Sequence, residues 1–168
     1  MKNKFIYLSV LAIGFMSCEP EFENDVNTNY TSGEADFSRY VAVGNSLTAG
    51  YMDGTVYKSG QANSFPNLLS QQFATIGGGA FTQPSFEEDV NNLGGIQGFA
   101  GTRLVINASA GGVQNIAGAS TITLTPQAKA YNNMGVPGAK SFHLGLQGYA
   151  ALNPYFARHA TSPTASVI

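Results

Sequence analysis

The sequence RYVAVGNSLTAGYMD, from Arg39 to Asp53, decides how this chain is interpreted. Residues 40–43 form a short apolar run rich in β-formers, which predicts a buried strand. The run breaks at Gly44 and Asn45 and then presents Ser46 before a turn towards a helix. In an open α/β sheet, ligands bind beyond the carboxyl ends of the strands. A serine there, beside the free N–H groups of a helix N-terminus, has the setting of a nucleophile for an acyl carbon.

The letters Gly-Asn-Ser alone are also ordinary turn chemistry, but the wider string is more specific. GNSLTAGY resembles the first block of the SGNH (GDSL) hydrolases, Gly-Asp-Ser-Leu-Ser/Thr-x-Gly-Tyr, with Gly44 and Leu47 in place and a departure at Asn45. The resemblance implies that Ser46 is the nucleophile and that its backbone N–H helps to form the oxyanion hole. An asparagine oxygen still accepts backbone hydrogen bonds, so we expect Asn45 to keep the local structure without supplying a charge. Thr48 excludes the Gly-x-Ser-x-Gly elbow of α/β-hydrolases.

The string YNNMGVPGAK lies about ninety residues further on. Within it, residues 133–138 fit the second SGNH block, Asn-x-x-x-x-Gly, and the resemblance implies that the N–H of Gly138 is an oxyanion-hole donor. A glycine suits that place, because a Cβ would obstruct the tetrahedral intermediate. A plain Pro-Gly turn explains the same letters. If both motifs follow strands of one sheet, Val41–Val43 and the segment entering Asn133 are neighbouring parallel strands.

The resemblance implies an α/β fold: a three-layer SGNH-hydrolase (flavodoxin-like) parallel sheet with helices on both faces, truncated here. The resemblance covers residues 38–168, which correspond to the N-terminal part of such a domain. The family's Gly-x-Asn-Asp and Asp-x-x-His blocks are missing from these residues. Lys140 and Phe156 stand three residues before His143 and His159, where the family has Asp. We therefore expect both histidines to be surface or helix-face residues, and the catalytic His and Asp and the oxyanion Asn to lie beyond residue 168.

Between the two blocks, Ser64-Phe65-Pro66 predicts a helix start with proline in the first turn. Leu68, Leu69 and Phe73 follow at helical spacing and are expected to pack that helix against the sheet. Residues 74–130 are rich in glycine and predict an insertion that shapes the substrate cleft. Three aromatic side chains either contact the substrate there or belong to the ordinary core: Phe81, Phe86 and Phe99.

The last part of the chain, residues 141–160, has apolar residues at imperfect helical spacing. The pattern predicts an amphipathic helix that Pro154 kinks or interrupts.

The first eighteen residues have the pattern of an export signal, with two lysines followed by an apolar run too short to span a bilayer, which takes roughly 20 residues. The run ends at Ser17-Cys18 and resembles a bacterial lipoprotein signal, with Cys18 as the lipidated residue. A plain secretory signal with an incidental cysteine is the alternative. Residues 19–37 carry six of the ten carboxylates and predict an acidic flexible tether. This organisation predicts an exported protein anchored by lipid to the outer membrane, and an anchor at the cell surface fits it too.

The composition excludes some functions. A net charge of −2 gives no concentrated basic face for nucleic acid. No phosphate loop and no spacing of metal ligands is present, so we expect no cofactor and no metal. The glycine runs at 77–79 and 94–95 lack the setting of a dinucleotide fingerprint and are interpreted as loops.

Two hypotheses remain at this point. In the first, the parent protein is an esterase or lipase that cleaves a small-molecule, lipid or carbohydrate ester through an acyl-enzyme on Ser46, and this segment alone is inactive. In the second, it is a non-catalytic surface lipoprotein that binds a glycan or another ligand. No sequence motif identifies the acyl group or the alcohol group of a substrate.

Overall fold

The central pair of strands is β1 (Ala42–Gly44) with β4 (Asn133–Gly135), which run parallel. Ala42 pairs with Asn133 and Gly44 with Gly135. The ladder continues one residue at each end, through Ala42 N–H to the Asn132 carbonyl (2.8 Å) and Val136 N–H to the Gly44 carbonyl (2.9 Å). The predicted parallel neighbours are confirmed, and the two motif loops therefore leave the same edge of the sheet.

The computed structural model describes residues 30–127 and 129–168, and residues 31–168 form the unit described here. The predicted signal peptide (1–18), with Cys18, and most of the predicted tether lie outside the described residues. Within the described part, no helix has the length and apolar character needed to cross a membrane.

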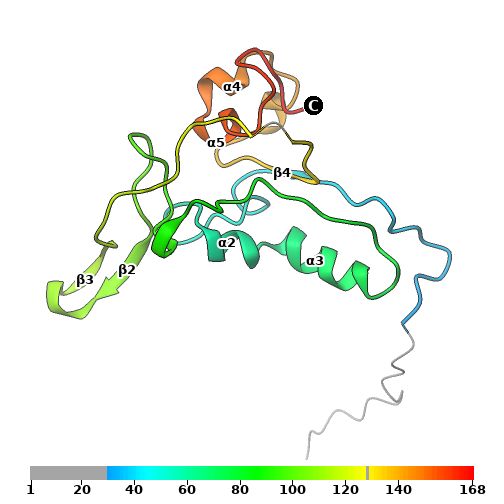
Figure 1. Ribbon diagram of the computed structural model, residues 1–168, viewed down its shortest axis with the longest axis horizontal. Helices are drawn as coiled ribbons and strands as arrows, with labels where there is room; N and C mark the ends of the chain where they lie inside the picture. The colour runs from blue at the N-terminus through cyan, green and yellow to red at the C-terminus, as the bar shows by residue number, and fades with distance from the viewer. Residues whose placement is uncertain (1–29, 128) are drawn as a thin grey trace, which may run out of the picture. The chain divides into compact units, whose positions relative to one another are not determined.

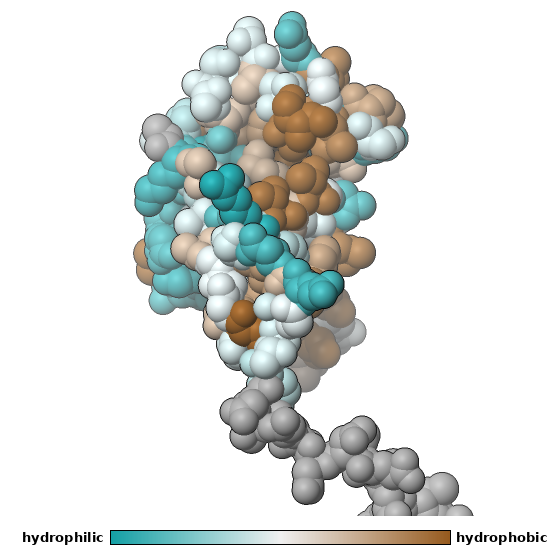
Figure 2. Space-filling view, turned by 90° about the vertical axis from the view of Figure 1, so that its right-hand side faces the viewer, coloured by the Kyte–Doolittle hydropathy of each residue, from teal (hydrophilic) through white to brown (hydrophobic). Residues whose placement is uncertain are grey.

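The prediction that residues 40–43 form a buried strand is wrong in two respects, because β1 spans Ala42–Gly44 and only one of its faces is buried. Ala42 is buried, but Val41 is 58% exposed and Val43 is 44% exposed. Successive side chains of a strand point to opposite faces, so one face of β1 meets the core and the valine face is largely exposed. Figure 2 shows hydrophobic side chains gathered on one face of the molecule.

Helices α2 (Lys58–Ala62) and α3 (Phe65–Ala74) follow the first motif and lie below the strand pair in Figure 1. Helix α3 begins where predicted, with Pro66 in its first turn. Its buried face consists of Pro66 and Ser70, whereas Leu68 and Leu69 are exposed, so their predicted packing against the sheet is wrong. Phe73 does pack, stacking on Phe37 with 4.4 Å between ring centroids.

The predicted insertion is mostly loop, with the short 3-10 turn η1 (Val90–Asn92) and a hairpin of β2 (Leu104–Asn107) and β3 (Gly112–Asn115) joined by η2 (Ala108–Ala110). The glycine runs lie in loops, as predicted. Phe86 is buried in a core cluster with Val56, Ile96 and Ile122, whereas Phe99 is exposed. Phe81 stacks on Tyr40.

Residues 141–160 do not form one helix, contrary to the prediction. They form η3 (Ser141–His143), α4 (Tyr149–Leu152) and α5 (Pro154–Ala157). Gly148, in the left-handed region at φ 82°, separates the first two. Pro154 interrupts the helix as predicted and begins α5, where the Asn153 side chain accepts from the N–H groups of Tyr155 (3.0 Å) and Phe156 (3.1 Å).

A second core cluster joins these helices to the end of β4, with Tyr149 and Phe156 packed on Val136. In Figure 1, α4 and α5 lie above the strand pair, opposite α2 and α3. The described chain is therefore a mixed α/β structure with one small parallel sheet and one small antiparallel sheet.

Candidate active site

Ser46 lies in a single helical turn that begins directly after β1. The Asn45 side-chain oxygen accepts from the N–H of Leu47 (3.2 Å), and the Asn45 carbonyl accepts from the N–H of Ala49 (3.1 Å). This is the hydrogen bonding of a helix N-cap, with Ser46 as the first residue of the turn. Asn45 thus makes the local hydrogen bond expected of it.

The turn also has a defined end. Tyr51 N–H donates to the Ser46 carbonyl (2.9 Å) and Gly50 N–H donates to the Leu47 carbonyl (3.2 Å). Gly50 has φ 77°, and the pair of bonds with a left-handed glycine is a Schellman motif. The Ser46 turn is therefore fixed at both ends by hydrogen bonds of its own residues.

Close contact with β4 fixes the position of this turn. A Cβ placed on Gly135 would lie 2.3 Å from the backbone nitrogen of Ala49 and 2.5 Å from the carbonyl carbon of Thr48. A Cβ on Gly44 would lie 2.1 Å from the Thr48 hydroxyl oxygen. At Gly135 the overlap is with backbone atoms and leaves no room for a Cβ, so the turn rests directly on the backbone of the neighbouring strand β4.

Gly138 lies in the corresponding turn after β4. Val136 to Ala139 form a β-turn closed by Ala139 N–H to the Val136 carbonyl (3.0 Å). Pro137 takes its second position and Gly138, at φ 81°, its third, which is the residue pattern of a type II turn. A Cβ at this position would meet only the Asn153 amide, at 3.8 Å, so the available space does not require a glycine. The positive φ requires it, because residues with a side chain rarely adopt that conformation.

The backbone N–H groups of Ser46 and Gly138 share one property. Neither donates a hydrogen bond to any described residue. Two free N–H groups at the carboxyl ends of adjacent parallel strands are the kind of donors that an oxyanion hole uses.

A cavity of about 350 Å³ lies between the two loops. Val43, Gly44 and Asn45 line it from the first loop, and Ala139, Lys140, Ser141 and Leu144 line it from the second. The lining residues are chain neighbours of Ser46 and Gly138 rather than those two residues themselves. Its volume is within the range of small-molecule sites.

His143 does not have the geometry of a base for Ser46. Its Nδ1 accepts from the N–H of Lys140 (3.2 Å), and its ring stacks on Tyr149 with 4.5 Å between centroids. A neutral imidazole that accepts at Nδ1 carries its proton on Nε2. Both nitrogens are then unable to take a proton from a serine hydroxyl.

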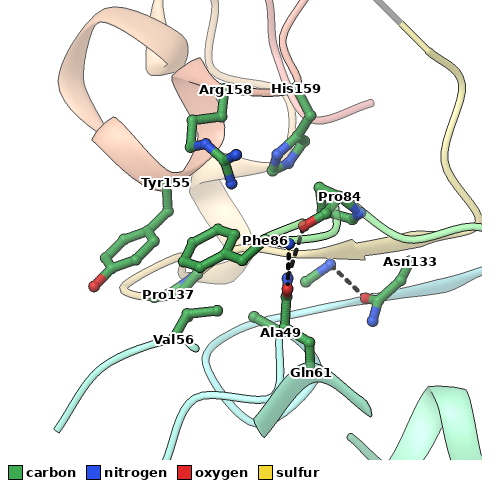
Figure 3. Close-up of a pocket in the computed structure, with 11 residues that line it drawn as sticks. Ala49, Val56, Gln61, Pro84, Phe86, Asn133, Pro137, Tyr155, Arg158 and His159 are labelled. Atoms are coloured by element: carbon green, nitrogen blue, oxygen red, sulfur yellow. Dashed lines mark hydrogen bonds between the residues drawn. The ribbon is translucent and has the colours of Figure 1, made fainter. Parts of the chain in front are cut away.

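His159 lies in the turn after α5 and is buried, with 8% of its surface exposed, so its predicted surface or helix-face position is wrong. The loop at residues 84–86 and the end of α5 enclose it in a small cavity, where it lies beside Arg158 (Figure 3). Burial, together with the smaller effect of the Arg158 charge, lowers the pKa of His159 to about 4. No carboxylate is bonded to its ring in the described part of the chain, and a group with that pKa is a poor general base near neutral pH.

Arg158 is a buried residue of this cavity that the sequence analysis did not identify. It is 1% exposed, donates from Nη2 to Glu88 and from Nε to the Thr123 carbonyl (3.0 Å), and lies over the Phe86 ring at 4.3 Å. No local pattern marks it, because its partners come from positions 35 to 72 residues earlier in the chain.

In residues 30–127 and 129–168, no three His, Cys, Asp or Glu side chains gather as a metal site requires. Comparison of the chain with protein-family models, curated proteins and solved structures finds no match.

Proposed function

We propose that this chain is the N-terminal part of a serine ester hydrolase of the SGNH type, with Ser46 as nucleophile. The observation that carries the proposal is the β1–β4 pair, which brings the capped Ser46 turn and the Gly138 turn to one sheet edge. The free N–H groups of Ser46 and Gly138 and the cavity between their loops support it.

In the proposed reaction, the hydroxyl oxygen of Ser46 attacks the ester carbonyl while a histidine accepts the hydroxyl proton. The N–H groups of Ser46 and Gly138 stabilise the negative charge on the carbonyl oxygen. The protonated histidine then protonates the departing alcohol, and water hydrolyses the acyl-enzyme by the same route. The substrate is a carboxylic ester of a small molecule, lipid or carbohydrate.

The base in this proposal lies in a segment after residue 168, together with its Asp and an oxyanion-hole Asn. Neither His143 nor His159 has the tautomer, exposure or carboxylate partner that the role needs. The exposed valine face of β1 supports a further layer packed on this sheet, since parallel sheets are usually covered on both faces. The finer architecture that we propose is the three-layer, flavodoxin-like SGNH sheet.

We further propose that Cys18 carries a lipid that anchors the protein to the outer membrane. An ester hydrolase on such an anchor acts outside the inner membrane, on esters that reach or form part of the envelope.

The test is hydrolysis of p-nitrophenyl acetate by the product of the whole gene. Ser46→Ala should abolish turnover, and Ser109→Ala, in the exposed turn η2, should leave it unchanged. Equal turnover by the wild type and Ser46→Ala would remove the proposal. If the whole gene encodes no downstream Asp-x-x-His and its product does not hydrolyse esters, the alternative of a non-catalytic binding lipoprotein is favoured.

A further inference from the structure

A second cavity, of about 20 Å³, lies behind the turn that carries Ser46. Ala49 and Gly135 form part of its wall, and Arg158 and His159 face it from the end of α5 (Figure 3). A space of about 10–15 Å³ holds one water-sized species. The cavity is therefore large enough for a single small ligand.

Most polar side chains that line this cavity already have partners. The Gln61 amide donates to the Pro84 carbonyl (2.7 Å) and accepts from Phe86 N–H (2.8 Å). The Asn133 amide donates to the Thr48 carbonyl (2.9 Å) and accepts from Gly135 N–H (3.0 Å). Because these amides are uncharged and already hydrogen-bonded, they do not favour a ligand of either charge.

Arg158 and His159 are different. Nη1 of Arg158 has no hydrogen-bond partner among the described residues, and neither ring nitrogen of His159 has one. Both side chains are more than nine-tenths buried. A guanidinium only donates, and a histidine ring always keeps at least one N–H. A group that accepts hydrogen bonds is therefore what these two side chains lack.

The charges around His159 also favour a negatively charged ligand. The groups that face it are Arg158, the edge of the Phe156 ring at 5.2 Å and the Tyr131 ring at 5.9 Å. The carboxylate of Glu88 is bonded to Arg158 Nη2 rather than to His159, and its side chain is 37% exposed. A protonated His159 would have no acidic partner of its own in the described structure.

We propose that the cavity binds a small monovalent anion, of the size of chloride, between Nη1 of Arg158 and a ring nitrogen of His159. The hydrogen bonds would be charge-assisted and shielded from water, which strengthens them. The site does not depend on the ester-hydrolase proposal, since neither side chain belongs to the proposed catalytic machinery.

Anion binding should be linked to proton uptake. An anion stabilises the charged imidazolium, so it raises the pKa of His159, and by the same linkage the anion binds more tightly as the pH falls. Over the range in which binding brings one proton onto His159, affinity should increase about tenfold for each pH unit.

The experiment compares thermal unfolding of the full chain in sodium chloride and in sodium gluconate of equal ionic strength, at pH 7 and pH 5. Gluconate is too large for the cavity. We expect a saturable rise in Tm with chloride that is larger at pH 5. Arg158→Met should remove the chloride effect and His159→Phe its pH dependence, whereas His143→Phe, as a matched control, should keep both.

A second measurement protects the test against variants that fail to fold. Imidazole NMR of the unaltered protein should show that chloride raises the pKa of His159. Identical melting in chloride and gluconate at both pH values would overturn the proposal. So would a chloride effect on Tm that leaves the pKa of His159 unmoved, because that anion would be bound elsewhere.

Discussion

The contact between the Ser46 turn and β4 predicts a large effect of a single methyl group at Gly135. In Gly135→Ala, the new Cβ would lie 2.3 Å from the Ala49 nitrogen, 2.5 Å from the Thr48 carbonyl carbon and 2.8 Å from the Ala49 Cα. All three are backbone atoms of the turn, so no rotation of a side chain relieves the overlap. The turn has to move away from β4 or the strand pair has to separate.

The magnitude follows from the cost of overpacking. An extra methyl group in a packed interior usually costs 1–3 kcal/mol, and the upper end, about 3 kcal/mol, applies where only backbone can yield. For a unit of this size we expect Tm to fall by about 10 °C. The matched control is Gly145→Ala, where nothing lies within 4 Å of the new methyl group and the glycine does not have a positive φ. Its Tm should stay within about 2 °C of the wild type.

The assay is thermal unfolding followed by circular dichroism, with urea unfolding as a second measure. Equal Tm values for Gly135→Ala and Gly145→Ala would refute the close packing of the Ser46 turn on β4. The position of Ser46 at the sheet edge would then lose its structural basis.

Two further predictions concern the signal and the buried histidine. Cys18→Ala should abolish fatty-acid labelling and membrane fractionation in the expressing bacterium, because the thiol is the proposed lipid attachment point; unchanged labelling would contradict the lipoprotein hypothesis. His159, with a native pKa of about 4 against an ordinary value near 6.5, takes up its proton more readily in the unfolded state, so stability should be full above about pH 6.5 and fall as the pH drops towards 4, by about 3 kcal/mol. Urea unfolding in gluconate at pH 7 and pH 4.5 measures this loss, and a loss of the same size in His159→Phe would assign it to other groups.

The local features of the chain could be predicted from sequence because their signals are local. The Asn45 cap, the start of α3 at Phe65 and the interruption at Pro154 each depend on residues within a few positions of one another. The parallel pairing of β1 with β4 is a long-range feature, and it could be predicted because each strand is followed by a recognisable glycine turn.

The burial of individual side chains could not be predicted in the same way. Val41 and Leu68 are apolar but exposed, because the described chain places no element over them. His159 and Arg158 are polar but buried, because the loop carrying Phe86 and Glu88 closes over them from 70 residues away. Burial depends on which segments meet in three dimensions, and apolar periodicity along the chain does not specify those meetings.

Some parts of the candidate site could likewise be predicted from the sequence and others could not. The Ser46 turn and the Gly138 turn have sequence motifs, whereas the open pocket that their loops line depends on the pairing of the strands. The tautomer of His143 follows from its bond to the Lys140 N–H, which the sequence pattern alone does not predict.

The most direct test of the central claim is labelling of Ser46 by a fluorophosphonate probe, located by peptide mass spectrometry. A serine hydroxyl reacts only when a hydrogen-bonded base takes its proton. The product of the whole gene should be labelled at Ser46, and the chain ending at Ile168 should not be. Absence of label on Ser46 in an esterase-active product of the whole gene would contradict the account, and so would labelling of the 168-residue chain that depends on His143 or His159.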